Sequence, residues 1–157
     1  MRALAQRVTR AQMHATRDND GGEIDVRSEI GAGLLVLLCV EEGDTGRELD
    51  WASDKIARLR VFDDDQGKMN LSVLDAGGEV MVISQFTLAG DARKGNRPSF
   101  VGAAQPSIAS PLVDRCVARL REQHGLTVAE GVFGGSMRIE LVNDGPVTLM
   151  IERRPGE

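Results

Sequence analysis

The chain has 157 residues, a length typical of one domain that buries a hydrophobic core without disulfide or metal support. Its 41% hydrophobic and 27% charged residues are typical of a globular protein, and its longest apolar run, Leu34–Val40, is too short to cross a bilayer. The net charge of −5 argues against unspecific coating of nucleic acid, and 3% aromatic residues argue against a base-stacking platform. We expect no secretion signal, a cytoplasmic location, and two cysteines, Cys39 and Cys116, that behave as small buried side chains.

Strands dominate the first part of the chain. Alternating residues predict a strand over Arg2–His14, and the turn-forming residues Arg17–Gly22 let Glu23–Ile30 pair back with it as a hairpin. The continuous apolar run Leu34–Val40 predicts a central strand that is covered on both faces. We therefore expect the sheet to be built around this run.

A helix and a turn follow. Apolar residues at helical spacing predict an amphipathic helix over Arg47–Arg60, and Thr45 and Glu48 at its start fit a capping box. The acidic segment Asp63–Gly67 lacks the spacing of a calcium loop, because Gly67 falls where a ligand is required. It is therefore expected to be a solvated turn.

A second buried strand ends in polar residues. Glu79–Leu88 is strongly apolar at Val80–Ile83 and then continues into Ser84–Thr87. Polar groups at the end of a buried strand are where sites are commonly built in mixed α/β sheets. The loop Gly90–Pro98 follows and carries three cations, Arg93, Lys94 and Arg97.

The last part of the chain predicts a helix and three strands. Ser110 and Pro111 fit a cap followed by a proline in the first helical position, and the helix is expected to end at His124-Gly125. The expected closing strands are Thr127–Phe133, Met137–Val142 and Val147–Ile151. The whole chain is thus predicted to be one compact α/β domain, residues 1–157, with 153–157 as a frayed tail.

The segment Asn143–Thr148 separates the last two of these strands. Its Gly145-Pro146 step removes one ladder donor and fixes one φ angle, and glycine adopts backbone angles that strain other residues. The pattern predicts a stiff, tight turn between antiparallel strands.

Several enzyme signatures are absent. Gly31–Gly33 lacks the third glycine of a dinucleotide fingerprint, and the Gly90–Gly95 spacing of a phosphate loop is followed by Asn96-Arg97 instead of Lys and Ser or Thr. The two histidines, His14 and His124, are more typical of a strand surface and a helix end than of a metal site or a Ser-His triad. The chain therefore has Ser84–Thr87 but no evident general base. Backbone donors could still form an oxyanion hole, and the missing base would have to come from the substrate.

Two long motifs of this chain, in the same order along the sequence, resemble those of a known family. Ser84–Leu88, followed by Arg93–Gly95 and Arg97–Phe100, resembles the family of D-aminoacyl-tRNA deacylases, and so does Asn143–Thr148 downstream. The opening Met1–Val8, the segment Gly131–Gly134 and Met137 are also similar to that family. The resemblance covers almost the whole chain.

The resemblance implies a fold and a reaction. The fold would be a mixed, barrel-like sheet with two amphipathic helices in α/β/β layers. The protein would be a homodimer that hydrolyses the ester between a D-amino acid, or glycine mischarged on tRNA-Ala, and the terminal adenosine of tRNA, with neither metal nor other cofactor. In this family the ribose 2′-hydroxyl takes the place of a side-chain base.

The resemblance also assigns roles to residues. The catalytic group is Ser84, Gln85, Phe86 and Thr87, with Gln85 and Phe86 offering backbone donors and Thr87 as a positioning group. The substrate-binding group is Gly145, Pro146, Met137, Phe133 and Asn143, in which a cis Gly-Pro bond reaches into the partner's pocket and excludes the L side chain. The tRNA phosphates would contact Arg93, Lys94 and Arg97.

The chain departs from the family at Ala89, Ala92 and Asn96, and its first hairpin, Met13–Glu29, is longer and more polar than usual. A module that binds adenosine or the tRNA end without hydrolysis is therefore an alternative function. A third alternative is a purely structural dimerisation domain. Ser84, Gln85 and Asn143-Asp144 argue against it, because they have no evident packing purpose.

Overall fold

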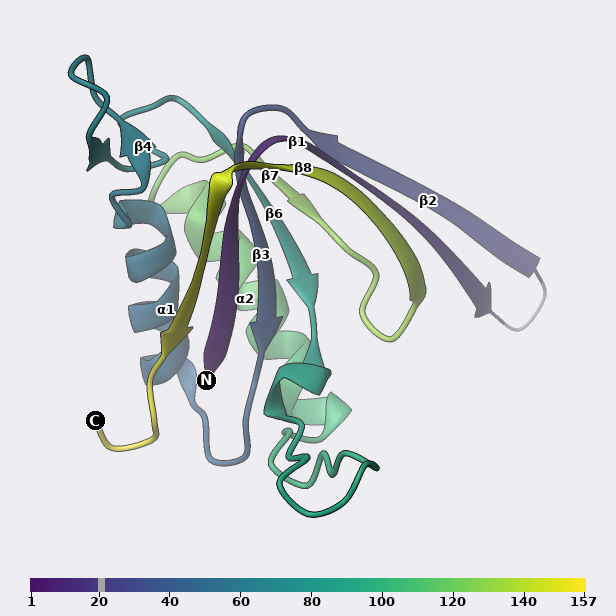
Figure 1. The fold of residues 1–157 in the computed structure, drawn as a ribbon. Helices are drawn as coiled ribbons and strands as arrows, with labels where there is room; N and C mark the ends of the chain where they lie inside the picture. The colour runs from purple at the N-terminus through teal and green to yellow at the C-terminus, as the bar shows by residue number, and fades with distance from the viewer. Residues whose placement is uncertain (20–21) are drawn as a thin grey trace.

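The sheet is organised around β1 (Arg2–Asn19), which pairs with three other strands (Figure 1). The computed structural model describes residues 1–19 and 22–157. β8 runs along one edge of β1, while β3 and then β2 occupy the other edge, and the sheet continues in the order β3-β6-β7. The remaining elements are β2 (Gly22–Ile30), β3 (Gly33–Cys39), α1 (Gly46–Arg58), β4 (Phe62–Asp63), β5 (Met69–Leu71), β6 (Glu79–Ser84), the 3-10 helix η1 (Phe86–Ala89), α2 (Pro106–Glu122), β7 (Val128–Glu130) and β8 (Ser136–Glu152).

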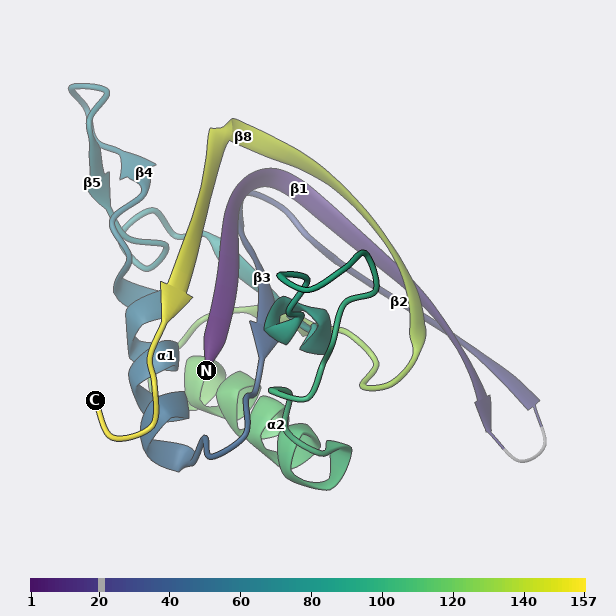
Figure 2. The same cartoon turned by 60° about the horizontal axis from the view of Figure 1, so that its bottom comes forward.

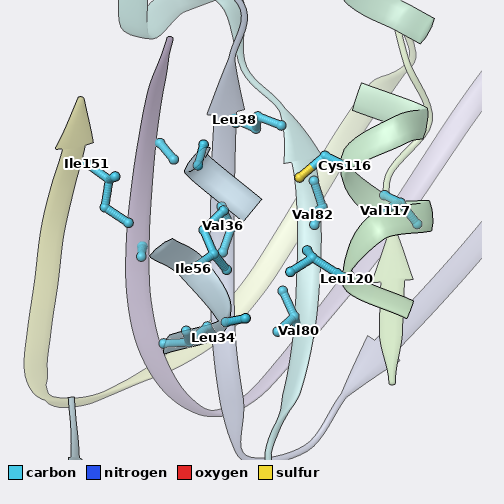
Figure 3. Packing of buried hydrophobic residues seen from close by; sticks show 14 of the residues in the cluster. Leu34, Val36, Leu38, Ile56, Val80, Val82, Cys116, Val117, Leu120 and Ile151 are labelled. Atoms are coloured by element: carbon cyan, nitrogen blue, oxygen red, sulfur yellow. The ribbon is translucent and has the colours of Figure 1, made fainter. Parts of the chain in front are cut away.

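The central strand β3 is buried on both faces, as predicted. Its alternate residues Leu34, Val36 and Leu38 point toward α1 and α2 and pack there against Val80 and Val82 of β6 (Figure 3). Leu35 belongs to a second cluster on the opposite face, together with apolar residues of β1 and β6. The continuous apolar run follows from this position, because a strand covered on both faces has no side that needs polar residues.

The first hairpin was also predicted, although β1 extends beyond the predicted end at His14. β1 and β2 pair antiparallel up to Asn19 and Gly22. The middle of the predicted turn, residues 20 and 21, lies outside the described residues.

The prediction of two strands joined by a tight turn at Asn143–Thr148 was wrong. The chain bends sharply there together with β1 but does not pair back on itself: both halves belong to β8, and both pair antiparallel with β1 (Figure 2). Asn143 pairs with Val8 and Thr148 with Gln6, so four residues of β8 lie opposite Arg7 alone. The Gly-Pro step interrupts the ladder as expected, but β1 continues past it, and the result is a large bulge in β8.

The two helices lie side by side on one face of the sheet (Figure 2). The capping box of α1 was predicted correctly: the Thr45 hydroxyl accepts the Arg47 N–H at 3.2 Å, and the Glu48 carboxylate accepts the Thr45 N–H at 2.9 Å. No helix in the described part of the chain is long and apolar enough to cross a membrane.

The predicted start of α2 at Ser110-Pro111 was wrong. α2 begins at Pro106, after Gln105 as its N-cap, and Pro111 lies inside the helix. Proline does occupy the first position of α2, as expected, but this proline is Pro106 and not Pro111.

Two other predicted strands are shorter in the structure. Glu79–Leu88 ends as a strand at Ser84, because the next residues turn into η1. Thr127–Phe133 is a strand only over Val128–Glu130, after which a turn with Gly134 at φ 71° leads to β8. The tail 153–157 starts beside β1, where the Arg153 N–H donates to Met1 O at 3.0 Å; its fraying stays a prediction.

Candidate active site

A cavity of about 590 Å³ opens at the carboxyl ends of the parallel strands β3 and β6. This is the edge at which ligands bind in open α/β sheets. Its walls are mainly apolar, with a few polar groups, as is typical of small-molecule sites. Five residues predicted for the site line it together: Ser84, Gln85, Phe86, Phe133 and Met137.

Another hollow, of about 720 Å³, lies on the β1–β2 hairpin and β8. It is lined by charged and polar side chains, among them Arg27, Glu29, Arg138 and Glu140. The charges alternate in sign, as on a solvated sheet face. Its lining includes none of the residues that the sequence motifs single out.

The floor of the cavity is a sharp change of backbone direction after β6. The Gln85 N–H donates to Leu38 O at 2.8 Å, which extends the pairing of β6 with β3 by one residue. The hydrogen bonds of η1 then begin with the Leu88 N–H and Gln85 O at 3.2 Å. The N–H groups of Phe86 and Thr87 therefore have no partner within η1. The expectation that Gln85 also offers its backbone donor was wrong, since that N–H is already bonded.

Thr87 is held by its neighbour. The Gln85 side-chain amide donates to the Thr87 hydroxyl, and Thr87 O accepts the Gly90 N–H at 3.0 Å. Across the described residues that line the cavity, none is His, Asp, Glu, Lys or Arg. The arrangement thus offers backbone donors for a developing oxyanion but no side-chain base.

The mouth of the cavity carries an aromatic pair. Phe86 is 56% exposed and meets Phe100 edge to face, with ring centroids 5.2 Å apart. Gly90 makes this approach possible: a Cβ there would lie 3.0 Å from Phe100 Cε1 and 2.9 Å from Thr87 O. Phe100 and Gln105 line the cavity but were not predicted as site residues. The sequence did contain a signal for Phe100, because it ends the motif segment Arg97–Phe100.

Cys39 lies beneath η1 and is fully buried. Burial, together with the nearby Glu41 carboxylate, raises the pKa of its thiol to about 11. The Cys39 thiol lies 3.6 Å from Phe86 O, within hydrogen-bonding distance for sulfur. A protonated, buried thiol is a packing group and not a nucleophile.

The corner Asn143–Thr148 lies on the bulge of β8 and does not line the cavity of its own chain. The Gly145–Pro146 bond is cis, and Gly145 has φ 122°. The Asn143 amide, predicted to contact substrate, binds within the corner: Oδ1 accepts the Val147 N–H at 3.1 Å and Nδ2 donates to the Thr148 hydroxyl at 2.9 Å.

Arg7 supports the corner and was not predicted. Its side chain is buried, donates to Asp144 O at 3.2 Å and to Val61 O at 2.6 Å, and pairs with the Asp63 carboxylate at 3.4 Å. A sequence signal for it exists. Arg7 continues the inward alternation of Ala3 and Ala5, so a charged residue occupies a position that the pattern assigns to the core.

The three cations of the loop differ in their surroundings. Arg93 is bound by Asp91 through its backbone N–H at 2.9 Å and its guanidinium at 2.6 Å, and these bonds lower the pKa of the Asp91 carboxyl to about 2. Lys94 and Arg97 are exposed, and the structure gives them no hydrogen-bond or ion-pair partner among the described residues. Nor do three His, Cys, Asp or Glu side chains gather as a metal site in the described ranges.

Comparison with known proteins agrees with the motifs. A family model described as D-Tyr-tRNA(Tyr) deacylase matches residues 4–152. The chain belongs to the D-aminoacyl-tRNA deacylase family. Members of this family are hydrolases of the ester bond of aminoacyl-tRNA. The resemblance and the α/β fold with a nearly closed, barrel-like sheet are thereby confirmed.

Relatives in the D-aminoacyl-tRNA deacylase family match from end to end. The D-aminoacyl-tRNA deacylase of Heliobacterium modesticaldum is 53% identical over 157 residues, covering 100% of this chain and 99% of the relative. That of Desulfitobacterium hafniense is 53% identical over 152 residues, or 97% of each chain. That of Parabacteroides distasonis is 46% identical over 157 residues, or 100% of each.

Two solved structures are similar to the chain. The c-Myc DNA Unwinding Element Binding Protein superposes with a TM-score of 0.84 and 38% identity, covering 98% of this chain and 99% of that one. A probable eukaryotic D-amino acid tRNA deacylase has a TM-score of 0.77 at 18% identity, covering 96% and 97%, and supports the fold alone.

Proposed function

We propose that the protein hydrolyses the ester that joins a D-amino acid, or glycine mischarged on tRNA-Ala, to the terminal adenosine of tRNA. The observation that carries this proposal is the cavity itself. Among the described residues its lining contains no side-chain base, and the N–H groups of Phe86, which lines it, and of the adjoining Thr87 have no partner within η1. Family membership supplies the substrate class. The reaction needs neither metal nor other cofactor.

The mechanism follows from these groups. A water molecule adds to the ester carbonyl, and the N–H groups of Phe86 and Thr87 stabilise the negative charge that develops on the carbonyl oxygen. The ribose 2′-hydroxyl relays the proton of the water to the ester oxygen, which leaves as the ribose hydroxyl. Ser84, Gln85 and the Thr87 side chain position the substrate and the backbone of η1.

A second copy of the chain completes the site. Gly145 and Pro146 of the partner enter the cavity, opposite Phe133 and Met137, and occupy the space that an L side chain needs. Exposed apolar residues of β8 support a homodimer, since Leu149 is 41% and Met150 47% exposed beside the corner. Burying such residues is the usual driving force of subunit association.

The loop that follows η1 contacts the tRNA. Lys94 and Arg97 extend from the segment next to Phe100 and neutralise phosphates of the acceptor end. Arg93, whose guanidinium is paired with Asp91, contacts the phosphates through its remaining N–H donors. The partners in this proposal are aminoacyl-tRNA and the second subunit, and the location is the cytoplasm.

Deacylation of D-tyrosyl-tRNA and L-tyrosyl-tRNA tests the proposal directly. We expect the D ester to be cleaved much faster than the L ester, with an unchanged rate when EDTA is added. Equal rates, or no cleavage of the D ester, would contradict the proposal. Binding of a non-hydrolysable aminoacyl-adenosine without turnover of the ester would instead favour the non-catalytic binding module, the alternative that Ala89 and Ala92 suggest.

Pro146→Ala tests the filter. Alanine lacks the ring that fixes φ and fills space, so the corner becomes softer and smaller. We expect the variant to cleave L-tyrosyl-tRNA about tenfold faster than the wild type, the effect of about 1.4 kcal/mol. A variant that keeps full discrimination would place the filter elsewhere.

A further inference from the structure

The corner lacks the hydrogen bonds that hold the rest of β8. Regular pairing with β1 stops at Asn143 and resumes at Thr148, and the four residues between them lie opposite Arg7 alone. Backbone that leaves a ladder needs other partners to keep one conformation. Here side chains replace the ladder.

Asn143 forms one of these replacements. Its Oδ1 accepts the Val147 N–H at 3.1 Å, and its Nδ2 donates to the Thr148 hydroxyl at 2.9 Å. Both partners follow Pro146, whereas Asn143 precedes Gly145, so one planar amide joins the two sides of the Gly-Pro step. The amide thereby closes a hydrogen-bonded ring that includes Gly145 and Pro146.

Thr148 connects this ring to the neighbouring strand. Its hydroxyl also accepts a hydrogen bond from the Gln6 amide at 3.3 Å, at the position where Gln6 and Thr148 pair. The hydroxyl therefore receives donors from β1 and from Asn143. These two hydrogen bonds thus hold the corner in one conformation and also fix its orientation relative to β1.

We propose that Asn143 and Thr148 are positioning residues for chiral discrimination. They set the direction in which Gly145 and Pro146 project, and thereby the fit against an L side chain in the partner's cavity. This inference rests on the proposed function of the corner. It gives Asn143 an indirect role, because both ends of its amide are already bound, in place of the predicted contact with substrate.

A matched pair of variants tests this role. Thr148→Val removes the hydroxyl at nearly constant volume, and Thr148→Ser retains it; the position is exposed, so both chains should fold. Asn143→Ala removes the amide from the other end. The readout is the ratio of kcat/KM for D-tyrosyl-tRNA to that for L-tyrosyl-tRNA, measured beside the thermal unfolding temperature of each variant.

Thr148→Val and Asn143→Ala should lower this ratio about tenfold, the worth of about one hydrogen bond, chiefly through faster cleavage of the L ester. Thr148→Ser should keep it within about twofold. Variants that unfold at lower temperature but keep the wild-type ratio would overturn the positioning role alone. A wild-type protein without preference for the D ester would overturn the proposed function, and this inference with it.

Discussion

The cavity and the corner Asn143–Thr148 hold their functional groups in different ways. In the cavity, the groups that we propose to face the substrate are backbone N–H groups, and the pairing of β6 with β3 and the turn of η1 fix them in place. In the corner, the backbone has left the ladder, and Arg7, Asn143 and Thr148 hold it through their side chains.

This difference predicts different responses to substitution. A backbone donor survives a change of its own side chain, so the chemistry of the cavity should tolerate single substitutions. A corner held by side chains should lose its geometry when one of them changes, or when a new atom is added within it. Rate and discrimination should therefore be separable by mutation.

Gly145→Ala should have the largest effect. Gly145 has φ 122°, and a Cβ there would lie 2.8 Å from Val147 Cγ2 and 3.1 Å from Val147 N. We expect a loss of about 2 kcal/mol in the free energy of unfolding, from strain at a left-handed position plus the clash. Urea denaturation measures the loss, and the D-to-L ratio should fall with it.

Gly67→Ala is the matched control. Gly67 has φ 72° in the exposed turn between β4 and β5, and nothing lies within 4 Å of its added Cβ. Its cost should be that of the backbone angle alone, about 1 kcal/mol, with an unchanged D-to-L ratio. If the two variants lose equal stability and both keep the ratio, the corner is not a tightly fitted element.

The sequence predicted what local patterns determine and missed what depends on a distant strand. The capping box of α1 needs only residues that are close in the chain, and the double burial of Leu34–Val40 appears in its composition. The bulge at Asn143–Thr148 was mistaken for a hairpin turn, because the same residues break a ladder in either case. Only pairing with β1, more than a hundred residues away, decides between them.

The candidate site shows the same division. Five cavity residues were found because they stand in contiguous motifs, and three of them follow one another at the end of β6. Arg7 was missed, since its partners Val61 and Asp144 are joined to it only by the folded sheet.

Glu48→Gln should have an intermediate effect, on stability alone. Hydrogen bonds from Thr45 hold the pKa of the Glu48 carboxyl at about 2, against 4.5 for the free group. Because the pKa is lower in the folded state, the carboxylate stabilises the fold above about pH 4.5, and this contribution is lost as the pH falls toward 2. At pH 7 the variant should be about 1 kcal/mol less stable than the wild type.

Urea denaturation between pH 7 and pH 2 measures this effect. The stabilities of wild type and Glu48→Gln should converge toward pH 2, while Glu122→Gln, on the exposed end of α2, should follow the wild type throughout. The D-to-L ratio at pH 7 should be the same for all three proteins. A shift of the ratio in Glu48→Gln would mean that general loss of stability alters discrimination, and would weaken the interpretation of Gly145→Ala.

Thr87→Val should have the smallest effect, although Thr87 lies at the centre of the motif. Its hydroxyl accepts a hydrogen bond from the Gln85 amide, and among the described residues no side-chain base lines the cavity to activate it. The backbone N–H of the residue, which valine retains, is the group assigned to the oxyanion. We expect kcat for D-tyrosyl-tRNA to fall by no more than about threefold, the low end of the worth of one hydrogen bond.

Thr87→Ser separates the two roles of this residue. If the hydroxyl were the nucleophile, serine would retain activity and valine would lose it about a thousandfold or more, with an acyl-enzyme detectable early in the reaction. If the backbone carries the chemistry, serine and valine should both remain close to the wild type and show no burst. Single-turnover kinetics of the two variants therefore decide whether the cavity acts through its main chain, as its contrast with the corner requires.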